Sequence, residues 1–226
     1  MVPKVSVIIP SIRDTSLNEK CLKQQIFTDF ETIIVRPIGK KPEGLFYTLN
    51  RDMNRGIRQS KGELIISYQD GIKIQPDTLS RFWEHYKMKP QSIVGAVGDQ
   101  YATLDPPVKV WIDPRKNSKF GTFYECMEND VEYTLCSIPR KALFDVGGFD
   151  EDNYDRGAAC AEKELNARMY KAGYKFYLDQ SIEYMAIKHP RMTSDWDKYY
   201  NVAVKMYSKH LEEIHKGTRK TIDFLS

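Results

Sequence analysis

One acidic residue stands directly after a strongly apolar run of this chain. Residues 64–77 read LIISYQDGIKIQPD, so Asp70 follows the run and Gly71 comes next. A carboxylate at the end of a strand can cap the turn that follows. It can also bind a ligand such as a divalent cation, because hard cations prefer oxygen ligands. Which of these roles Asp70 has depends on what else the fold brings close to it.

The first half of the chain predicts alternating strands and helices. Three continuous apolar, β-branched runs are typical of strands buried on both faces, and they lie at residues 5–10, 30–35 and 64–67. Apolar residues spaced three or four apart predict helices at about residues 16–26, 45–57 and 76–86. The βαβαβα order predicts a parallel sheet with helices on both faces. Ligands bind beyond the carboxyl ends of such strands, so we expect Asp70 to lie at a ligand site with the loops at 11–14 and 36–44.

The second half is less regular. Strands are predicted at residues 94–97, 123–138, 176–178 and 182–187, and residues 101–121 have the composition of a loop. Short helices are predicted at residues 139–146 and 159–172, each followed by glycine. An apolar stripe from about residue 195 to 214 predicts a helical tail that packs onto the main domain.

The composition excludes several classes of protein. The 226 residues are 41% hydrophobic and 29% charged, which is typical of a globular domain. A net charge of +3 does not by itself indicate nucleic-acid binding. The four cysteines have neither CxxC pairing nor metal-ligand spacing, which favours reduced thiols in a cytosolic protein. No stretch has the roughly 20 apolar residues that span a bilayer, and the apolar run near the N-terminus is too short for a signal peptide, so we expect a soluble, cytoplasmic protein.

Five motifs in order resemble family-2 glycosyltransferases of the GT-A fold. They are VSVIIPS, MNRGIRQSKGELI, an acidic turn followed by QPDTL, VGGFDE, and AEKELNARMYKAGYK. Each motif is weak alone, but together they extend over residues 5 to about 190. The resemblance implies an α/β GT-A fold with a mostly parallel central sheet, helices on both faces and a C-terminal helical tail. It divides the chain into a transferase domain, 1–190, with a nucleotide-sugar half (1–100) and an acceptor half (101–190), and a helical extension, 191–226.

The resemblance also implies an activity, the inverting transfer of a hexose or related sugar from a nucleotide-diphospho-sugar to an acceptor hydroxyl. This reaction needs a stabilised diphosphate leaving group, a base for the acceptor and an anomeric carbon held in line between them. The family's catalytic Asp, the general base for the acceptor hydroxyl, falls on Glu162. The alternative for Glu162 is a first-turn acid favoured by the helix macrodipole, which would lower its pKa. Glu164 is expected to pair with Arg168 four residues later.

A divalent cation, Mn²⁺ or Mg²⁺, is implied at the acidic turn. The family places two acids there, separated by one residue, but the matching positions here hold Gln69 and Gly71 with Asp70 between them. The resemblance therefore implies Asp70 and His189 as the metal ligands. Because the acidic pair is missing, the sequence leaves open whether the activity depends on a metal. The alternative for His189 is a packed or solvent-facing side chain that binds no metal.

Substrate contacts are implied on both halves of the chain. Arg36 stands where the family carries acids, and its guanidinium suits phosphate. Arg51 stands where the family contacts the nucleotide, and a solvated position on the helix face is the alternative for it. The nucleotide-sugar contacts implied are Pro10, Ser11, Arg13, Arg36, Arg51, Asn54, Gln69 and Asp70. The acceptor-facing residues implied are Trp111, Asp150 and Asp155. The acceptor itself stays open among a glycan, a lipid-linked saccharide, a small molecule and a modified base.

Two other functions are compatible with the sequence. A catalytically silent nucleotide-sugar-binding or scaffold protein on a GT-A frame would account for the missing acidic residues. A glycosyltransferase acting on modified nucleic acid bases is compatible with the mild basicity and with Trp111, and would show steeply salt-dependent binding to DNA.

Overall fold

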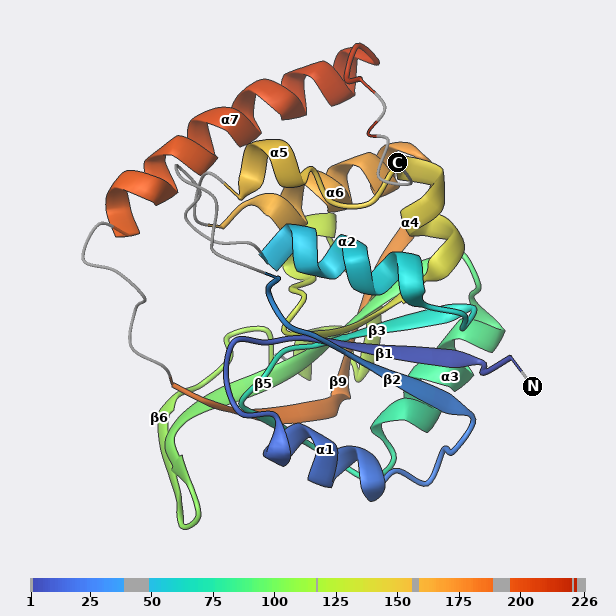
Figure 1. The fold of residues 1–226 in the computed structure, drawn as a ribbon, viewed down its shortest axis with the longest axis vertical. Coiled ribbons are helices and arrows are strands. Elements are labelled where there is room, and N and C mark those ends of the chain that lie inside the picture. Colours follow the sequence, from blue (N-terminus) through green and yellow to red (C-terminus); the bar gives the residue numbers. More distant parts are fainter. Residues whose placement is uncertain are drawn as a thin grey trace.

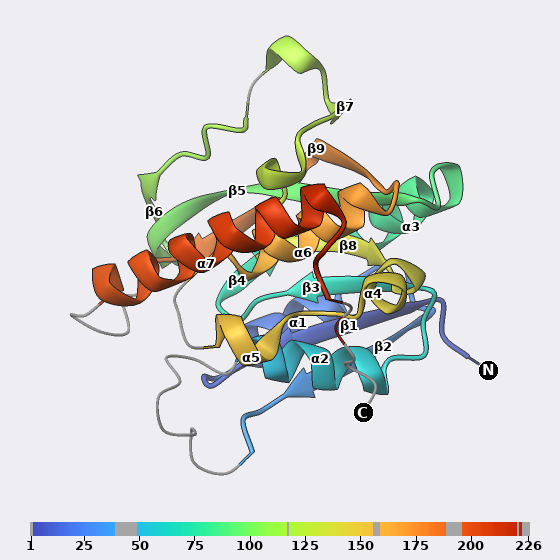
Figure 2. The same ribbon diagram turned by 90° about the horizontal axis from the view of Figure 1, so that it is seen from above.

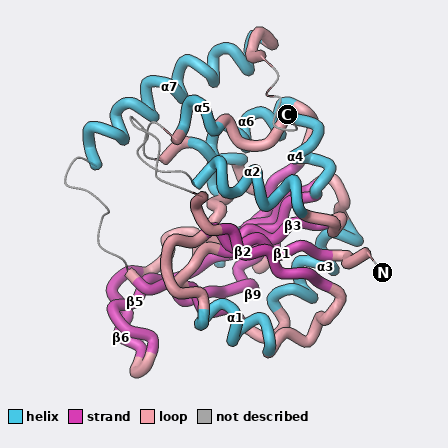
Figure 3. Tube along the Cα trace, viewed as in Figure 1, coloured by secondary structure: helices cyan, strands magenta, loops and turns pink. Residues whose placement is uncertain are grey.

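The structure is a computed structural model of the chain, and it describes residues 2–38, 49–116, 118–155, 159–188, 196–220 and 222. The described residues form one mixed sheet of nine strands in the centre of the molecule, with helices on both faces (Figures 1 and 3). Seven of these strands follow one another in the order β2-β1-β3-β8-β5-β9-β4. The remaining two described strands, β6 and β7, pair with β5 and β9.

The predicted parallel core of the sheet is present. β1 (Val5–Pro10) lies between β2 (Phe30–Val35) and β3 (Leu64–Tyr68), and it is parallel to both. The four strands that complete the path are β8 (Leu135–Pro139), β5 (Ser92–Leu104), β9 (Lys175–Ile187) and β4 (Ile72–Ile74). Five strands of this path (β2, β1, β3, β5 and β9) run in one direction, and β8 and β4 run in the other. The sheet is therefore mostly parallel, as predicted.

Side chains alternate between two cores along the strands, as the period of two in a strand requires. Ile8 and Ile65 belong to one core, and Val7, Ile9 and Ile66 to the other. The first core is covered by α2 (Leu49–Gln59), α4 (Arg140–Val146), α6 (Ala161–Lys171) and α7 (Trp196–Lys216). The second is covered by α1 (Ser16–Lys23) and α3 (Thr78–Met88), on the opposite face of the sheet (Figure 1). A short helix, α5 (Glu151–Tyr154), lies next to α2.

Three segments differ from the prediction. The segment predicted as a loop contains the strand β6 (Pro107–Trp111), which pairs with the end of β5. All five residues of β6 are exposed, so the strand lacks the alternation of apolar and polar residues that marks a half-buried strand. The strand predicted at 123–138 is instead β7 (Phe123–Glu125) and β8, with the short 3₁₀ helix Glu128–Asp130 between them. The two short strands predicted after residue 175 form the single strand β9, which has a register shift in its pairing with β5.

The C-terminal helix packs along α6, and Figure 2 shows the two helices side by side above the sheet. After α7 the chain returns to the end of α4. Gly147, which ends α4 at a φ of 85°, would place an added Cβ 1.9 Å from the carbonyl oxygen of Ile222. The tail therefore crosses directly over this glycine. Among the described residues, none of the helices has the length and apolar content needed to span a membrane.

Candidate functional site

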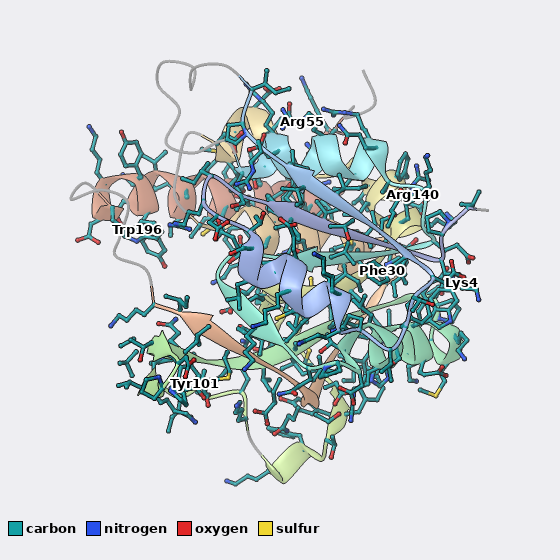
Figure 4. The ribbon with its side chains drawn as sticks, turned by 60° about the horizontal axis from the view of Figure 1, so that its bottom comes forward. Lys4, Phe30, Arg55, Tyr101, Arg140 and Trp196 are labelled. Carbon is teal, nitrogen blue, oxygen red and sulfur yellow. The ribbon has the colours of Figure 1, made fainter. Side chains whose placement is uncertain are left out.

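A pocket of about 300 Å³ lies at the carboxyl ends of β1 and β3, where parallel sheets bind their ligands. Its walls come from the ends of these strands and the loops after them, the segment before β8, residues at both ends of α5 (Phe149, Tyr154 and Asp155), and the beginnings of α2, α6 and α7. The apolar part of the wall includes Leu49, Met53, Phe149, Tyr154 and Trp196. Trp196, at the start of α7, is labelled in Figure 4. The polar part includes Arg13, Asn50, Asp70, Asp155 and Glu162.

Asp70 joins the turn after β3 to the loop after β1. The Ser11 hydroxyl donates a hydrogen bond to Asp70 Oδ2 at 2.6 Å, and Arg13 Nη1 lies 3.1 Å from Oδ1. The Asp70 side chain is 10% exposed and that of Arg13 is 37% exposed. Gly71, with a φ of 70°, permits the turn. Asp70 therefore holds two loops together at the edge of the pocket, which is more than a local turn cap.

Arg36 supports the same loop from β2. Its Nη1 donates to the backbone oxygens of Ser11, at 3.3 Å, and of Arg13, and its Nη2 donates to the Thr15 hydroxyl at 3.1 Å. Arg36 therefore joins the start of the segment after β2 to the loop after β1, at the edge where Asp70 lies; residues 39–44 of the predicted loop lie outside the described residues. Arg36 itself is exposed and does not line the pocket.

Glu162 reaches the pocket from the first turn of α6. It is half-buried, and burial raises its pKa above the ordinary value of 4.5; the negative charge of Glu132, which also lines the pocket, raises it further. The expectation that the helix N-terminus would lower this pKa is wrong, because burial outweighs the helix field. The two residues before α6, Ala159 and Cys160, both have positive φ angles, of 68° and 67°. Such backbone strain clusters at functional sites.

Asp155 is the most buried acid of the pocket. Its Oδ1 accepts hydrogen bonds from the Asn50 backbone N–H at 3.2 Å and from Asn50 Nδ2 at 2.9 Å. Its Oδ2 is buried and has no hydrogen-bond partner among the residues that the structure describes. Burial raises the pKa of Asp155 to about 7. The resemblance implies that Asp155 faces the acceptor, and in the structure it lies against the first turn of α2.

Two residues expected at the nucleotide hold the GGFDE segment in place. Asn54 is fully buried; its Nδ2 donates to the Phe149 carbonyl and to Glu151 Oε2, and its Oδ1 accepts from the Phe149 N–H, each at 2.8 Å. Arg51 Nε lies 3.5 Å from Glu151 Oε1. Neither residue lines the pocket. Their bonds fix α5 against α2, which positions Asp155.

The structure does not bring the other acceptor-facing candidates to the pocket. Asp150 is buried and caps α5, accepting from the Asn153 N–H at 3.2 Å. Trp111 lies at the end of β6 and is 43% exposed.

Of the residues expected at the nucleotide-sugar, four line the pocket: Pro10, Arg13, Gln69 and Asp70. His189 lies outside the described residues.

Asp150, Glu164 and His210 place three potential metal ligands within 4.8 Å of one another. Both carboxylates are already bonded to guanidinium groups, because Arg219 contacts both and Arg168 pairs with Glu164 at 2.8 Å, as predicted. Burial, with the positive charge of Arg219, lowers the pKa of His210. We interpret this cluster as an ion-pair network that needs no cation to balance its charge.

The turn at Asp70 fits a divalent cation only in part. Asp70 and the amide oxygen of Gln69 are the kind of ligands that Mn²⁺ and Mg²⁺ prefer, and the Ser11 hydroxyl orients the carboxylate as outer-shell partners do. Asp70 Oδ1 already pairs with Arg13, so a cation would share the carboxylate with this guanidinium. Two protein ligands are too few for a closed site. The described residues therefore suit a cation that also takes oxygens from a bound phosphate and from water.

Several pocket residues were missed from the sequence. Asn50 lies four residues before Asn54, so the two share a helix face, and this spacing is the one signal that could have indicated it. Glu132, Tyr133 and Thr134 precede a strand without any motif. Trp196 was predicted only as part of an apolar helical stripe.

Comparisons with known proteins identify the fold. No protein-family model and no curated protein sequence matches the chain, but solved structures do. A crystal structure of GalNAc-T7 with UDP, GalNAc and Mn²⁺ matches with a TM-score of 0.66 and 11% identity, over 93% of this chain and 48% of that one. A crystal structure of S. aureus TarS matches with a TM-score of 0.63 and 14% identity, over 95% of this chain and 42% of that one.

Both neighbours are GT-A glycosyltransferases, and the chain has their fold. At these identities the likeness shows the fold alone. The chain spans less than half the length of each neighbour.

Proposed function

We propose that this protein is an inverting glycosyltransferase that moves a hexose or related sugar from a nucleotide-diphospho-sugar to an acceptor hydroxyl. The observation that carries the proposal is that Asp70 and Glu162, 92 residues apart, line one pocket at the carboxyl edge of a GT-A sheet. Asp70 suits the diphosphate side of the reaction, and Glu162 suits proton transfer from the acceptor. The GT-A neighbours, one of them crystallised with UDP and Mn²⁺, support a nucleotide-sugar donor.

The donor diphosphate would lie at the loops after β1 and β3. Arg13 lines the pocket with its guanidinium partly exposed, and a guanidinium matches the oxygens of a phosphate group. Pro10 and Gln69 form the neighbouring wall. Ser11 and Arg36 hold the loop that carries Arg13, so we assign them to positioning.

A divalent cation, Mn²⁺ or Mg²⁺, is part of the proposal. Asp70 and Gln69 would hold it together with the donor phosphates, and it would offset the charge that develops on the leaving diphosphate. Because the described residues supply so few ligands, we expect the cation to bind tightly only when a nucleotide is present. His189 remains a proposed additional ligand.

Glu162 is the proposed general base. It accepts the proton of the acceptor hydroxyl as the acceptor oxygen bonds to the anomeric carbon. The bond from that carbon to the diphosphate breaks at the same time, and the nucleoside diphosphate leaves with the electron pair. A raised pKa favours this role, since a base is most effective when its pKa is close to the working pH.

The remaining assignments follow from this function. Residues 1–190 form the proposed transferase domain, and residues 191–226 form the helical extension, whose α7 supplies Trp196 to the pocket. All four cysteines are free thiols, which is typical of the reducing cytoplasm. The acceptor carries a hydroxyl group, and its class is not assigned.

The test combines donor binding with turnover. The protein is titrated with UDP-, GDP- and dTDP-sugars, with and without Mn²⁺, while thermal unfolding and donor hydrolysis are measured. We expect one donor class to raise the melting temperature and to be hydrolysed slowly. Stabilisation without hydrolysis or transfer would favour a silent binding protein, and no response to any donor would contradict the proposal.

A further inference from the structure

One carboxylate oxygen in the pocket wall is not accounted for by the fold. Asp155 lines the pocket, and its side chain is fully buried. Its Oδ2 has no hydrogen-bond partner within the described part of the chain. Buried polar atoms in native proteins are nearly always paired, so an unpaired one requires an explanation.

The hydrogen bonds from Asn50 go to the other oxygen of Asp155, and the Arg51 N–H also stabilises the carboxylate. Oδ1 accepts from the Asn50 N–H and from Asn50 Nδ2, which caps the first turn of α2. Asn or Ser would cap a helix as well as Asp, without burying a second charged oxygen. Oδ2 takes no part in the hydrogen bonds from Asn50.

We propose that Oδ2 of Asp155 binds a hydroxyl group of the donor's sugar ring. The inference rests on the proposed function and adds the residue that recognises the sugar. It makes Asp155 a binding residue for the donor, whereas the sequence placed it at the acceptor.

The protonation behaviour of Asp155 favours a hydroxyl over other polar groups. Its pKa of about 7 means that ionised and protonated forms coexist near neutral pH. The ionised form only accepts a hydrogen bond at Oδ2, whereas the protonated form can donate one. A hydroxyl group both donates and accepts, so it pairs with either form, while an ammonium group only donates and a carbonyl only accepts.

The position of Asp155 favours the donor sugar. In a nucleotide-diphospho-sugar the sugar is bonded directly to the diphosphate, so a diphosphate at Asp70 places the sugar in the same pocket. Aromatic rings form the rest of this wall: Tyr133 and Phe149 meet edge to face, with centroids 5.5 Å apart. Polar groups on one side and apolar ring faces on the other suit a sugar, which has hydroxyl groups and C–H faces.

The tyrosine hydroxyls of this wall are already engaged outside the pocket. The Tyr133 hydroxyl donates to Asn166 Oδ1 at 2.7 Å, and the Tyr154 hydroxyl lies 3.2 Å from His210 Nδ1. These residues therefore present mainly their rings to a ligand. Of the two tyrosines and the neighbouring Asp155, Asp155 is the one that offers a polar atom to a ring hydroxyl.

The experiment compares Asp155→Asn with wild-type protein and with Asp152→Asn. Asp152 is an exposed acid on α5, so its substitution controls for the loss of one negative charge nearby. Each protein is titrated calorimetrically with a nucleoside diphosphate and with the matching nucleotide-sugar, chosen from UDP, GDP and dTDP pairs. Wild type is also titrated with the 2-, 3-, 4- and 6-deoxy forms of that sugar donor.

We expect Asp155→Asn to bind the nucleoside diphosphate within about twofold of wild type and the nucleotide-sugar about tenfold more weakly. One deoxy donor should lose about tenfold on wild type and almost nothing on the variant, because both changes remove the same hydrogen bond. Asp152→Asn should match wild type throughout.

Three results would overturn the inference. Equal losses for nucleotide and nucleotide-sugar would show that Asp155 acts only through α2. Unchanged binding by the variant, or full affinity of wild type for every deoxy donor, would show that Oδ2 does not touch the sugar. A wild-type protein that binds no nucleotide or donor would instead contradict the proposed function, from which the inference starts.

Discussion

Replacing Asp155 with asparagine should remove a pH dependence of the protein's stability. The substitution keeps the shape of the side chain and an oxygen that can accept from Asn50, but it removes the ionisable group. Burial raises the pKa of Asp155 from 3.8 to about 7 in the folded state. Between these two values the folded protein keeps a proton that the unfolded chain has released, so wild-type stability falls as the pH rises and is level above about pH 7.

The magnitude follows from the difference between the two pKa values. About three pKa units, at 1.36 kcal/mol each, amount to about 4 kcal/mol in total, of which about 2.5 kcal/mol is lost between pH 5 and pH 8. Asparagine does not titrate, so the variant lacks this loss. An amide NH₂ in the place of Oδ2 costs about 1–3 kcal/mol at either pH, and this cost cancels when the two pH values are compared.

The assay is urea unfolding of wild type and Asp155→Asn at pH 5 and pH 8. The free energy of unfolding of the variant, relative to wild type, should rise by about 2.5 kcal/mol from the lower to the higher pH. Asp152→Asn should show no such change. The contribution of Glu162, whose pKa is also raised, is common to all three proteins. A difference between Asp155→Asn and wild type that is the same at both pH values would refute the assignment of a buried, unpaired carboxylate.

Three further predictions concern the reaction and the tail. Glu162→Gln should lower transfer at least a hundredfold while the donor dissociation constant stays within about twofold; a weakened donor with transfer intact would remove Glu162 from the role of base. Asp70→Asn should weaken donor and Mn²⁺ binding together by at least tenfold, and wild type should bind Mn²⁺ tightly only with a nucleoside diphosphate present; titrations that match wild type would leave Asp70 as a residue that only joins loops. Arg219→Ala should lower the free energy of unfolding by about 3 kcal/mol, because it leaves the buried Asp150 and Glu164 carboxylates short of a partner. Lys220→Ala, at an exposed neighbour, should change it by less than about 0.5 kcal/mol, and equal effects of the two would show that the tail is not held by Arg219.

The parts of the fold predicted correctly are those with a strong local signal. β1 and β3 begin where the apolar runs begin, because a strand buried on both faces has few polar residues to obscure it. β2 also begins where predicted, but the expectation that it is buried on both faces is wrong: it lies at the end of the strand path, and only Val35 of its six residues is buried. The position of Asp70 beside the loop after β1 follows from parallel strand order alone. β6 was missed because an exposed strand has no buried face and so no alternating pattern.

The details of the site depend on contacts between distant residues, which local patterns do not encode. Asn54 has the residue type and position expected of a nucleotide contact, but its hydrogen bonds go to Phe149 and Glu151, almost a hundred residues away. The helix position of Glu162 predicted a lowered pKa, and only the packing of the pocket shows that burial raises it. Trp196 reaches the pocket because α7 packs along α6, and nothing in its surrounding sequence specifies that contact.

The central claim is that one pocket holds the diphosphate beside Asp70 and the reacting sugar carbon beside Glu162. A crystal structure of the protein with a non-hydrolysable nucleotide-sugar and Mn²⁺ tests it most directly. We predict density for the diphosphate against Arg13 and Asp70, with the sugar between Asp155 and Glu162. A nucleotide bound elsewhere, or a sugar whose anomeric carbon faces away from Glu162, would contradict the claim.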